Sequence, residues 1–373
     1  MPPPSDITEI LWSWGPGESR LLLLAGDRPV EVVVERPEGL TGAVFLGRVC
    51  TVDRSLDAAF VEIGTGERPG FLPGAAALDL SEGAALVVQV RADARGGKGP
   101  KLSADLRDCP EDVLAGLATA KPPALLWRPH VLERLLAAHP AVARVVVDDA
   151  AALAEARRWF AAAARRPLPE VDEVLEEALA PVVVLPSGGR LVIEATAALT
   201  AMDVDSGAGR PVEANREAVA AIARQIRLRG IGGQITVDFV SGPKGTPYKL
   251  AAALKRAVAA DPVPTHVFGV TPLGMVELTR ERRGPSLAEI LCRRSTDLTA
   301  ESVALAALRR VLAEADARPG AALALVAAPE VATALARLGG AVAETERRLG
   351  RTLVVRSQPG RDREDVLIEE VTI

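Results

Sequence analysis

Two short apolar strands, each with an aspartate near its end, flank a single amphipathic helix in the middle of the chain. The first strand pattern ends at Asp203-Val204-Asp205, and the second, QITVDFV, carries Asp238. Residues 212–229 lie between them and repeat apolar side chains at helical spacing. Strand, helix and strand at this spacing form a βαβ unit, whose two strands are parallel neighbours. We therefore predict an α/β sheet with both aspartates at the edge where open α/β sheets bind ligands.

The first hundred residues have a different pattern. Residues 7–105 contain short apolar runs separated by turn residues at intervals of about 8–12 positions. The first two runs turn at Gly26-Asp27, which is a hairpin signal. This spacing indicates a small barrel or sandwich. A basic loop over residues 95–101, which contains Lys98 and Lys101, follows its last strand.

The rest of the chain mixes helices and strands. Residues 110–166 alternate the two patterns, a helix is predicted near 170–180, and Ser187-Gly188-Gly189 marks a second hairpin. Residues 300–373 contain a helix, a strand, a helix and two strands, which indicates a small α+β appendage. A length of 373 residues with 49% apolar side chains is enough for two or three domains, each with its own core.

Charge and cysteine content exclude several classes of protein. The net charge of −5 argues against a broadly basic coat protein but permits a local basic groove. Cys50, Cys109 and Cys292 are far apart, and the three histidines are scattered, so a disulfide framework or a Cys- or His-based metal site is unsupported. We find no targeting segment and no apolar run near the roughly 18 residues that span a bilayer. We expect a cytoplasmic protein with no membrane partner.

Asp203 and Asp238 are the strongest candidates for chemistry. Two carboxylates at one sheet edge can hold Mg²⁺, with water and substrate phosphates as the other ligands. Such an ion can generate a hydroxide and stabilise charge on a phosphodiester. Asp205 and Ser206 are further oxygen donors in the same turn. The alternative is that each aspartate caps the turn or helix that follows it.

Basic residues cluster around these acids. Between positions 216 and 256 only Glu217 and Asp238 oppose eight basic residues, namely Arg216, Arg224, Arg227, Arg229, Lys244, Lys249, Lys255 and Arg256. Arg280, Arg282 and Arg283 follow. We expect Arg216, Arg224, Arg227 and Arg229 on or near the exposed face of the helix, where they could hold a phosphate backbone. The alternative is an ordinary solvated helix face.

Three of the six phenylalanines, Phe45, Phe60 and Phe71, lie in the β-rich region. Exposed aromatic rings on a barrel, beside Lys98 and Lys101, would form a stacking platform for single-stranded nucleic acid. The alternative is that all three rings belong to the core. We favour the core for Phe45, and periodicity does not decide between the two for Phe60 and Phe71.

Five long segments resemble the ribonuclease E/G family, in the family's order. The segment RVCTVDRSLDAAFVEIGTGERPGFLPG resembles the inserted S1-type RNA-binding domain, and RGGKGPKLS resembles its exit loop. Three others resemble the catalytic region: EEALAPVVVLPSGGRLVIEATAALTAMDVDSG, IARQIRLRGIGGQITVDFV and FGVTPLGMVELTRERRGPSLAEILC. The resemblance implies a chain of the α/β class, which is α+β when all of its domains are taken together. It implies an RNase H-like α/β nuclease core, an inserted five-stranded OB-fold and a small C-terminal α+β domain.

The resemblance also implies an activity. Members of this family cleave single-stranded RNA endonucleolytically with Mg²⁺, and leave a 5′ phosphate and a 3′ hydroxyl. The two metal-binding aspartates fall on Asp203 and Asp238, with Mn²⁺ as a possible substitute ion, and a third position, usually Asn, falls on Asp205. Phe60 and Phe71 fall on the aromatic residues that bind RNA. The basic residues assigned to the RNA are Lys98, Lys101, Arg224, Arg227, Arg229 and Arg280.

The chain departs from the family at several points. The two-cysteine zinc motif is reduced to Cys292 followed by Arg293-Arg294, so we expect no zinc, leave a homodimer open and doubt the family's tetramer. The Arg and Thr that read a 5′ monophosphate have no evident counterpart, so we expect no 5′-monophosphate sensing. We also expect no long scaffold tail like that of ribonuclease E, so the expected plan is closer to ribonuclease G.

We therefore expect an endoribonuclease of RNA processing or decay. The alternative is an RNA-binding protein that keeps this scaffold and cleaves weakly or not at all. The predicted division is 1–40 for N-terminal strands of the core, 41–105 for the barrel, 106–285 for the catalytic core, 286–300 for a linker and 301–373 for the C-terminal domain.

Overall fold

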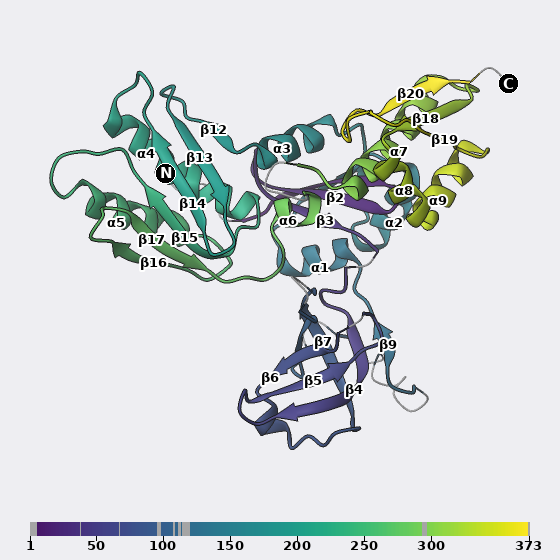
Figure 1. Cartoon of the computed structure of the whole chain (residues 1–373), viewed down its shortest axis with the longest axis horizontal. Coiled ribbons are helices and arrows are strands. Elements are labelled where there is room, and N and C mark those ends of the chain that lie inside the picture. The colour runs from purple at the N-terminus through teal and green to yellow at the C-terminus, as the bar shows by residue number, and fades with distance from the viewer. Residues whose placement is uncertain are drawn as a thin grey trace. The chain divides into compact units, whose positions relative to one another are not determined.

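The chain is represented by a computed structural model (Figure 1). It describes residues 6–37, 39–66, 68–94, 98–106, 109–110, 113, 120–292 and 297–371. The chain divides into two compact units. The core unit consists of Met1–Pro37, His139–Arg282 and Ser286–Ile373, and the barrel unit of Glu38–Ala138 with Arg283–Pro285. The five-part division expected from the sequence stays a prediction.

The barrel unit is built on five strands. These are β4 (Val44–Asp53), β5 (Ala58–Glu62), β6 (Gly70–Pro73), β7 (Ala85–Ala92) and β8 (Lys101–Ser103). The order β5-β6-β8-β7-β4 closes because β4 also pairs with β5, and β6 and β8 are the parallel pair. The unit also holds η1 (Ala75–Leu78), β9 (Ala124–Trp127) paired with β4, and α1 (Val131–Ala138). A closed five-stranded barrel agrees with the OB-fold that we predicted.

Apolar side chains from alternate positions of these strands fill the barrel. Phe45 is only 2% exposed and packs with Val61, Leu72 and Leu102, so its assignment to the core is confirmed. The strands approach closely at Gly70, where an added Cβ would lie 2.4 Å from a methyl carbon of Leu102. Glycine is therefore required at that position of β6.

The first sheet of the core unit has the order β11-β10-β1-β2-β3. Its strands are β1 (Glu9–Gly15), β2 (Glu18–Ala25), β3 (Arg28–Glu35), β10 (Arg144–Val147) and β11 (Ala164–Arg165). The hairpin predicted at Gly26-Asp27 joins β2 to β3. The helices α2 (Ala150–Trp159) and α3 (Pro169–Leu179) follow β10 and β11. Leu11, Leu22 and Val146 pack with α3 residues Val171 and Leu175 in one core.

The second sheet of the core unit has the order β12-β13-β14-β15-β17-β16. Its strands are β12 (Val182–Val184), β13 (Arg190–Ala195), β14 (Thr200–Asp205), β15 (Gly233–Asp238), β16 (Thr265–Val270) and β17 (Val276–Arg280). β14 and β15 are parallel and are joined through α4 (Pro211–Leu228), as predicted. α4 and α5 (Thr246–Val258) bury one face of this sheet in a single apolar core (Figure 1).

The chain ends in a small α/β layer. It contains α6 (Leu287–Leu291), α7 (Ala300–Ala317), β18 (Leu323–Ala327), α8 (Pro329–Arg337), α9 (Gly339–Leu349), β19 (Val354–Ser357) and β20 (Leu367–Glu370). The strand order is β19-β18-β20, and the helix predicted between the first two strands is two helices, α8 and α9. Of the expected linker 286–300, residues 287–291 form α6 and residues 293–296 lie outside the described part.

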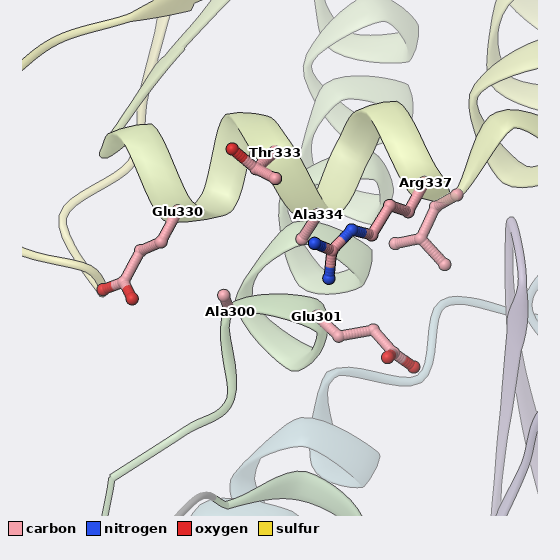
Figure 2. Close-up of a pocket in the computed structure, with 7 residues that line it drawn as sticks. Ala300, Glu301, Glu330, Thr333, Ala334 and Arg337 are labelled. Atoms are coloured by element: carbon pink, nitrogen blue, oxygen red, sulfur yellow. The ribbon is translucent and has the colours of Figure 1, made fainter.

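A pocket of about 370 Å³ lies between the start of α7 and α8 (Figure 2). Its two acidic residues already have partners within the chain. Glu301 pairs with Arg36 at 2.9 Å, and Glu330 pairs with Arg363 at 2.7 Å. Among the described residues, no helix has both the length and the apolar character needed to cross a membrane.

Candidate active site on the second sheet

Asp203 and Asp238 occupy directly paired positions of the parallel strands β14 and β15. Strand alternation puts them on the face opposite the helices, because Met202, Val204 and Val237 point into the core. Both aspartates are exposed. Paired residues of neighbouring strands lie about 5 Å apart, so the two carboxylates are side by side on the open face. The prediction that the fold brings them together is confirmed.

Within the described part of the chain, neither carboxylate has a hydrogen-bond or ion-pair partner. The alternative that each aspartate caps the following turn is therefore wrong for this pair. Two like charges at directly opposite positions repel each other, and a sheet gains nothing from them. A divalent cation would relieve this repulsion, and oxygen ligands suit Mg²⁺. The residues present therefore fit the ion that the resemblance implies.

Any such site would be open. Among the described residues there is no group of three or more His, Cys, Asp and Glu side chains placed to hold a metal. Two carboxylates would leave most of the coordination positions of Mg²⁺ for water and substrate oxygens. This is the usual arrangement where Mg²⁺ acts on a phosphate group.

Asp205 behaves differently from the other two aspartates. Arg190, at the paired position of β13, donates from Nε at 2.9 Å and from Nη2 at 2.6 Å to Asp205 Oδ2. The Gly207 backbone N–H donates to Oδ1 at 2.8 Å. The Gly207 hydrogen bond and then Arg190 hold the pKa of Asp205 below its usual range. Asp205 thus caps its own turn, and both of its carboxylate oxygens are occupied.

Asn215, on the buried side of α4, fixes the backbone beyond Asp238. Its Nδ2 donates to the Val240 carbonyl at 2.8 Å, and its Oδ1 accepts from the Val240 N–H at 3.0 Å. Nearby on α4, Glu217 accepts a hydrogen bond from the Ser187 N–H at 2.9 Å and holds the β12–β13 turn. Sequence reasoning missed Arg190 and Asn215. A buried asparagine in an apolar helix face was the available signal for Asn215.

The expectation that α4 exposes Arg224, Arg227 and Arg229 is wrong. Arg224 donates to Glu177 at 2.7 Å and to the Pro29 carbonyl at 3.1 Å. The other two are also engaged: Arg227, 8% exposed, pairs with Glu31 at 3.3 Å, and Arg229, 7% exposed, donates to Gln225 at 2.6 Å. Burial lowers the pKa of Arg229 to about 10.

The cause is that α4 also packs against β3 of the first sheet. Part of the side of the helix that its own sheet does not cover is therefore covered by β3. Arg280 is likewise 7% exposed, pairs with Asp261 at 2.7 Å and donates to the Ile231 carbonyl at 3.0 Å. These four guanidinium groups hold the core unit together, and we do not assign them to an RNA surface.

Other basic residues of the cluster remain exposed. They are Arg216, Lys244, Lys249, Lys255 and Arg256. Lys244 lies in the segment that leaves β15 beyond Asp238. Lys249 lies in the first turn of α5, next to Tyr248, which is 68% exposed. Of the exposed basic residues, Lys244 and Lys249 follow Asp238 most closely in the sequence.

Phe60 and Phe71 occupy paired positions of β5 and β6. Both are half-buried and neither belongs to the barrel core. Their ring centroids are 5.9 Å apart in an edge-to-face arrangement with an interplanar angle of 64°. Lys101 of β8 pairs with Phe71, and Thr51 of β4 pairs with Phe60, so the four residues form one row across the barrel surface. Lys98 is exposed, and residues 95–97 of the basic loop lie outside the described part.

Comparison with known proteins gives one consistent result. A sequence model of the Ribonuclease E/G family matches residues 76–283 of this chain. Ribonuclease G of Salmonella typhimurium and Ribonuclease G of Escherichia coli K12 are each 33% identical over 207 residues, which cover 51% of this chain and 42% of the relative. Ribonuclease E of Synechocystis is 27% identical over 375 residues, covering 71% of this chain and 55% of the relative.

The chain spans about half the length of the curated relatives it matches. The matched region runs from the barrel through β14, α4 and β15 to the end of β17, and so includes both aspartates of the pair. Because the family match covers more than half of its 373 residues, the chain belongs to the ribonuclease E/G family.

Proposed function

We propose that this chain is an endoribonuclease that cleaves single-stranded RNA with Mg²⁺ held by Asp203 and Asp238, and that Mn²⁺ can replace Mg²⁺. One observation carries the proposal. The two carboxylates lie in register on parallel strands, on an open face, without partners in the described part of the chain. The described part of the chain does not neutralise these two like charges. Such a pair at a defined place is a candidate for binding a ligand that neutralises it.

The protein's own contribution is to position and orient. When bound, the ion supplies a water of lowered pKa and stabilises charge on the phosphodiester. Asp203 and Asp238 hold it from the side of the sheet, since strand pairing fixes their spacing. Asn215 holds the end of β15 in place through Val240. The open face leaves room for a sugar–phosphate backbone above the pair.

RNA binding would use two surfaces of different chemistry. The row Phe60, Phe71 and Lys101, with Lys98 nearby, offers aromatic rings for bases and ammonium groups for phosphates. The segment that follows β15 in the sequence, with the exposed Lys244 and Lys249, offers cations for phosphates. We assign base stacking to the barrel and backbone contact to the second sheet.

Two further properties follow from the departures noted in the sequence. We propose cleavage without 5′-monophosphate sensing, and a homodimer in place of the family's tetramer. We also propose that the chain acts in the cytoplasm. Zinc would have no part in assembly, because Cys292 has no neighbouring cysteine. Cys292 is also buried, and burial raises the pKa of its thiol, which disfavours the thiolate that binds zinc. Well under one zinc per dimer is expected by elemental analysis, and stoichiometric zinc would contradict this.

The second candidate is an RNA-binding protein with weak or no catalysis. One observation favours it: four arginines that we had assigned to RNA are occupied within the core unit. A weakly basic surface beside the pair would hold the scissile strand less firmly.

Cleavage of an unstructured A/U-rich RNA decides between the two candidates. We expect internal cuts with Mg²⁺ or Mn²⁺, none in EDTA, and none with Asp203→Asn or Asp238→Asn. Glu194→Gln, which removes an exposed carboxylate from β13, is the matched control and should cut normally. If Asp203→Asn or Asp238→Asn cuts at the wild-type rate, the assignment of the pair fails. If the wild type binds the RNA but leaves it intact with either metal, the second candidate holds.

A further inference from the structure

Arg190 and Asp205 form an ion pair on the same open face as the aspartate pair. The β13–β14 register places Arg190 opposite Asp205, and Val192 opposite Asp203. Alternation puts Asp203 and Asp205 on one side of β14, roughly 6–7 Å apart along the strand. The pair therefore lies next to the proposed metal site and not elsewhere on the sheet.

Three aspartates of β14 and β15 thus share this face with Glu194 and Glu277, and of the three aspartates only Asp205 is neutralised within the described part of the chain. Asp203 and Asp238 have no partner in the described part, whereas Asp205 has two hydrogen bonds from Arg190 and one from Gly207. A guanidinium group is suited to this task because its planar donors fix a carboxylate in direction as well as in charge. The orientation of Asp205 is therefore determined by contacts within the chain.

We propose that Arg190 is a positioning residue that keeps Asp205 from becoming a third carboxylate ligand of the metal. This rests on the proposed function. A free carboxylate two residues from Asp203 could reach the same ion, and each added carboxylate binds a divalent cation more tightly. It would also cancel part of the positive charge that should act on the scissile phosphate, and it would repel the RNA backbone. Arg190 prevents these three effects, so the site works with two carboxylates.

The fold itself does not depend on this ion pair. The side chains of Arg190 and Asp205 are 59% and 37% exposed, and exposed ion pairs add little to stability. Removing either partner should therefore leave the chain folded. Changes in metal or RNA binding can then be assigned to the site.

The test is a double-mutant cycle of Arg190→Gln, Asp205→Asn and both together, with Arg190→Lys as the conservative variant. The measurements are Mn²⁺ affinity by calorimetry without RNA, affinity for single-stranded RNA in EDTA, and thermal melting. Arg190→Gln should tighten Mn²⁺ binding several-fold and weaken RNA binding. Asp205→Asn should leave Mn²⁺ affinity unchanged. The double variant should return to wild-type Mn²⁺ affinity, and Arg190→Lys should lie between wild type and Arg190→Gln.

Asp203→Asn serves as the reference for loss of a ligand. If Asp205→Asn weakens Mn²⁺ binding as much as Asp203→Asn does, Asp205 is a ligand and the proposal is wrong. Wild-type Mn²⁺ affinity in Arg190→Gln would also overturn it, because the ion pair would then restrain nothing. If Asp203→Asn itself leaves Mn²⁺ binding unchanged, the assignment of the metal site is wrong, and so is the proposed function. The cycle distinguishes this outcome from one in which only the role of the Arg190–Asp205 ion pair is wrong.

Discussion

The core unit contains two groups of charged residues that differ in burial and in whether the chain supplies them with partners. At the β1–β2 turn, Glu18 is 3% exposed and is enclosed by arginines. Its Oε1 accepts from Arg20 at 2.7 Å, its Oε2 accepts from Arg36 at 2.9 Å, and its carbonyl accepts from Arg309 at 2.7 Å. On the second sheet, Asp203 and Asp238 are exposed and unpartnered in the described part of the chain.

The difference indicates what each group is for. A buried carboxylate must be compensated by the chain itself, because water cannot reach it. The Glu18 group is compensated and ties α7 to the first sheet, so it serves the fold. An exposed carboxylate pair without compensation contributes nothing to the fold, and a ligand is the simplest reason for its geometry. The predictions below test this division.

The largest effect on stability is expected for Glu18→Gln. Breaking one side of a buried ion-pair group leaves uncompensated charges and should lower the free energy of unfolding by about 3–5 kcal/mol. Denaturant melts measure this, with Glu194→Gln as the exposed control. A loss below that of the control would show that the Glu18 group does not hold the fold.

The same residue gives a prediction about pH. Burial opposes ionisation of Glu18, but Arg20, Arg36 and Arg309 outweigh it and lower its pKa. A carboxylate with a lowered folded pKa contributes stability above its unfolded pKa and loses it as the pH falls through the folded value. The wild type should therefore lose stability in acid below the ordinary glutamate range, and Glu18→Gln should lose less over that interval. Equal acid losses would contradict the assignment.

The sequence predicted the acidic pair and not the arginines, for a physical reason. Asp203 and Asp238 follow from local rules, since alternation sets the face and a βαβ unit makes the strands parallel. The environment of Arg227 depends on Glu31, almost two hundred positions away, and on α4 packing against the first sheet. A helical period gives the direction of a side chain but not what covers it. In the sequence, a buried arginine cannot be told from an exposed one, because its long apolar stem can pack in either environment.

Two other features of the structure could not be predicted from the sequence, for the same reason. The Arg190–Asp205 pair depends on the register between β13 and β14, which a shift of one residue would abolish. Phe60 and Phe71 are half-buried and lie edge to face, so they belong neither to the core nor to the fully exposed surface. The closed barrel could be predicted because its turn spacing and the family resemblance both indicated a barrel.

Truncating the barrel aromatics should affect binding and not the fold. Phe60→Ala and Phe71→Ala should each weaken single-stranded RNA binding by about 1–3 kcal/mol if the rings stack on bases. Binding curves in EDTA measure this, with thermal melts alongside. Core residues would instead lower stability by roughly 3–5 kcal/mol. A stable variant with unchanged affinity would remove the barrel row from the proposed RNA surface.

Asn215→Ala should separate positioning from folding on the second sheet. Loss of both hydrogen bonds to Val240 should lower stability by about 1–3 kcal/mol. It should also slow cleavage at saturating RNA, because the end of β15 that carries Asp238 is no longer fixed. RNA binding in EDTA should not change. A drop in melting temperature with normal cleavage would restrict Asn215 to a structural role.

The smallest of the predicted free-energy effects is the change in stability of Asp203→Asn, and it is the most informative. Removing one of two like charges on paired strands should raise stability by about 0.2–1 kcal/mol in EDTA, the opposite sign to Glu18→Gln. Mg²⁺ should then raise the melting temperature of the wild type, because a ligand that binds only the folded state stabilises it, and should not raise that of the variant. Melts in EDTA and in Mg²⁺ measure both quantities on the same samples. A loss of stability in EDTA would mean that Asp203 serves the fold after all, and an equal response to Mg²⁺ would mean that the ion binds elsewhere.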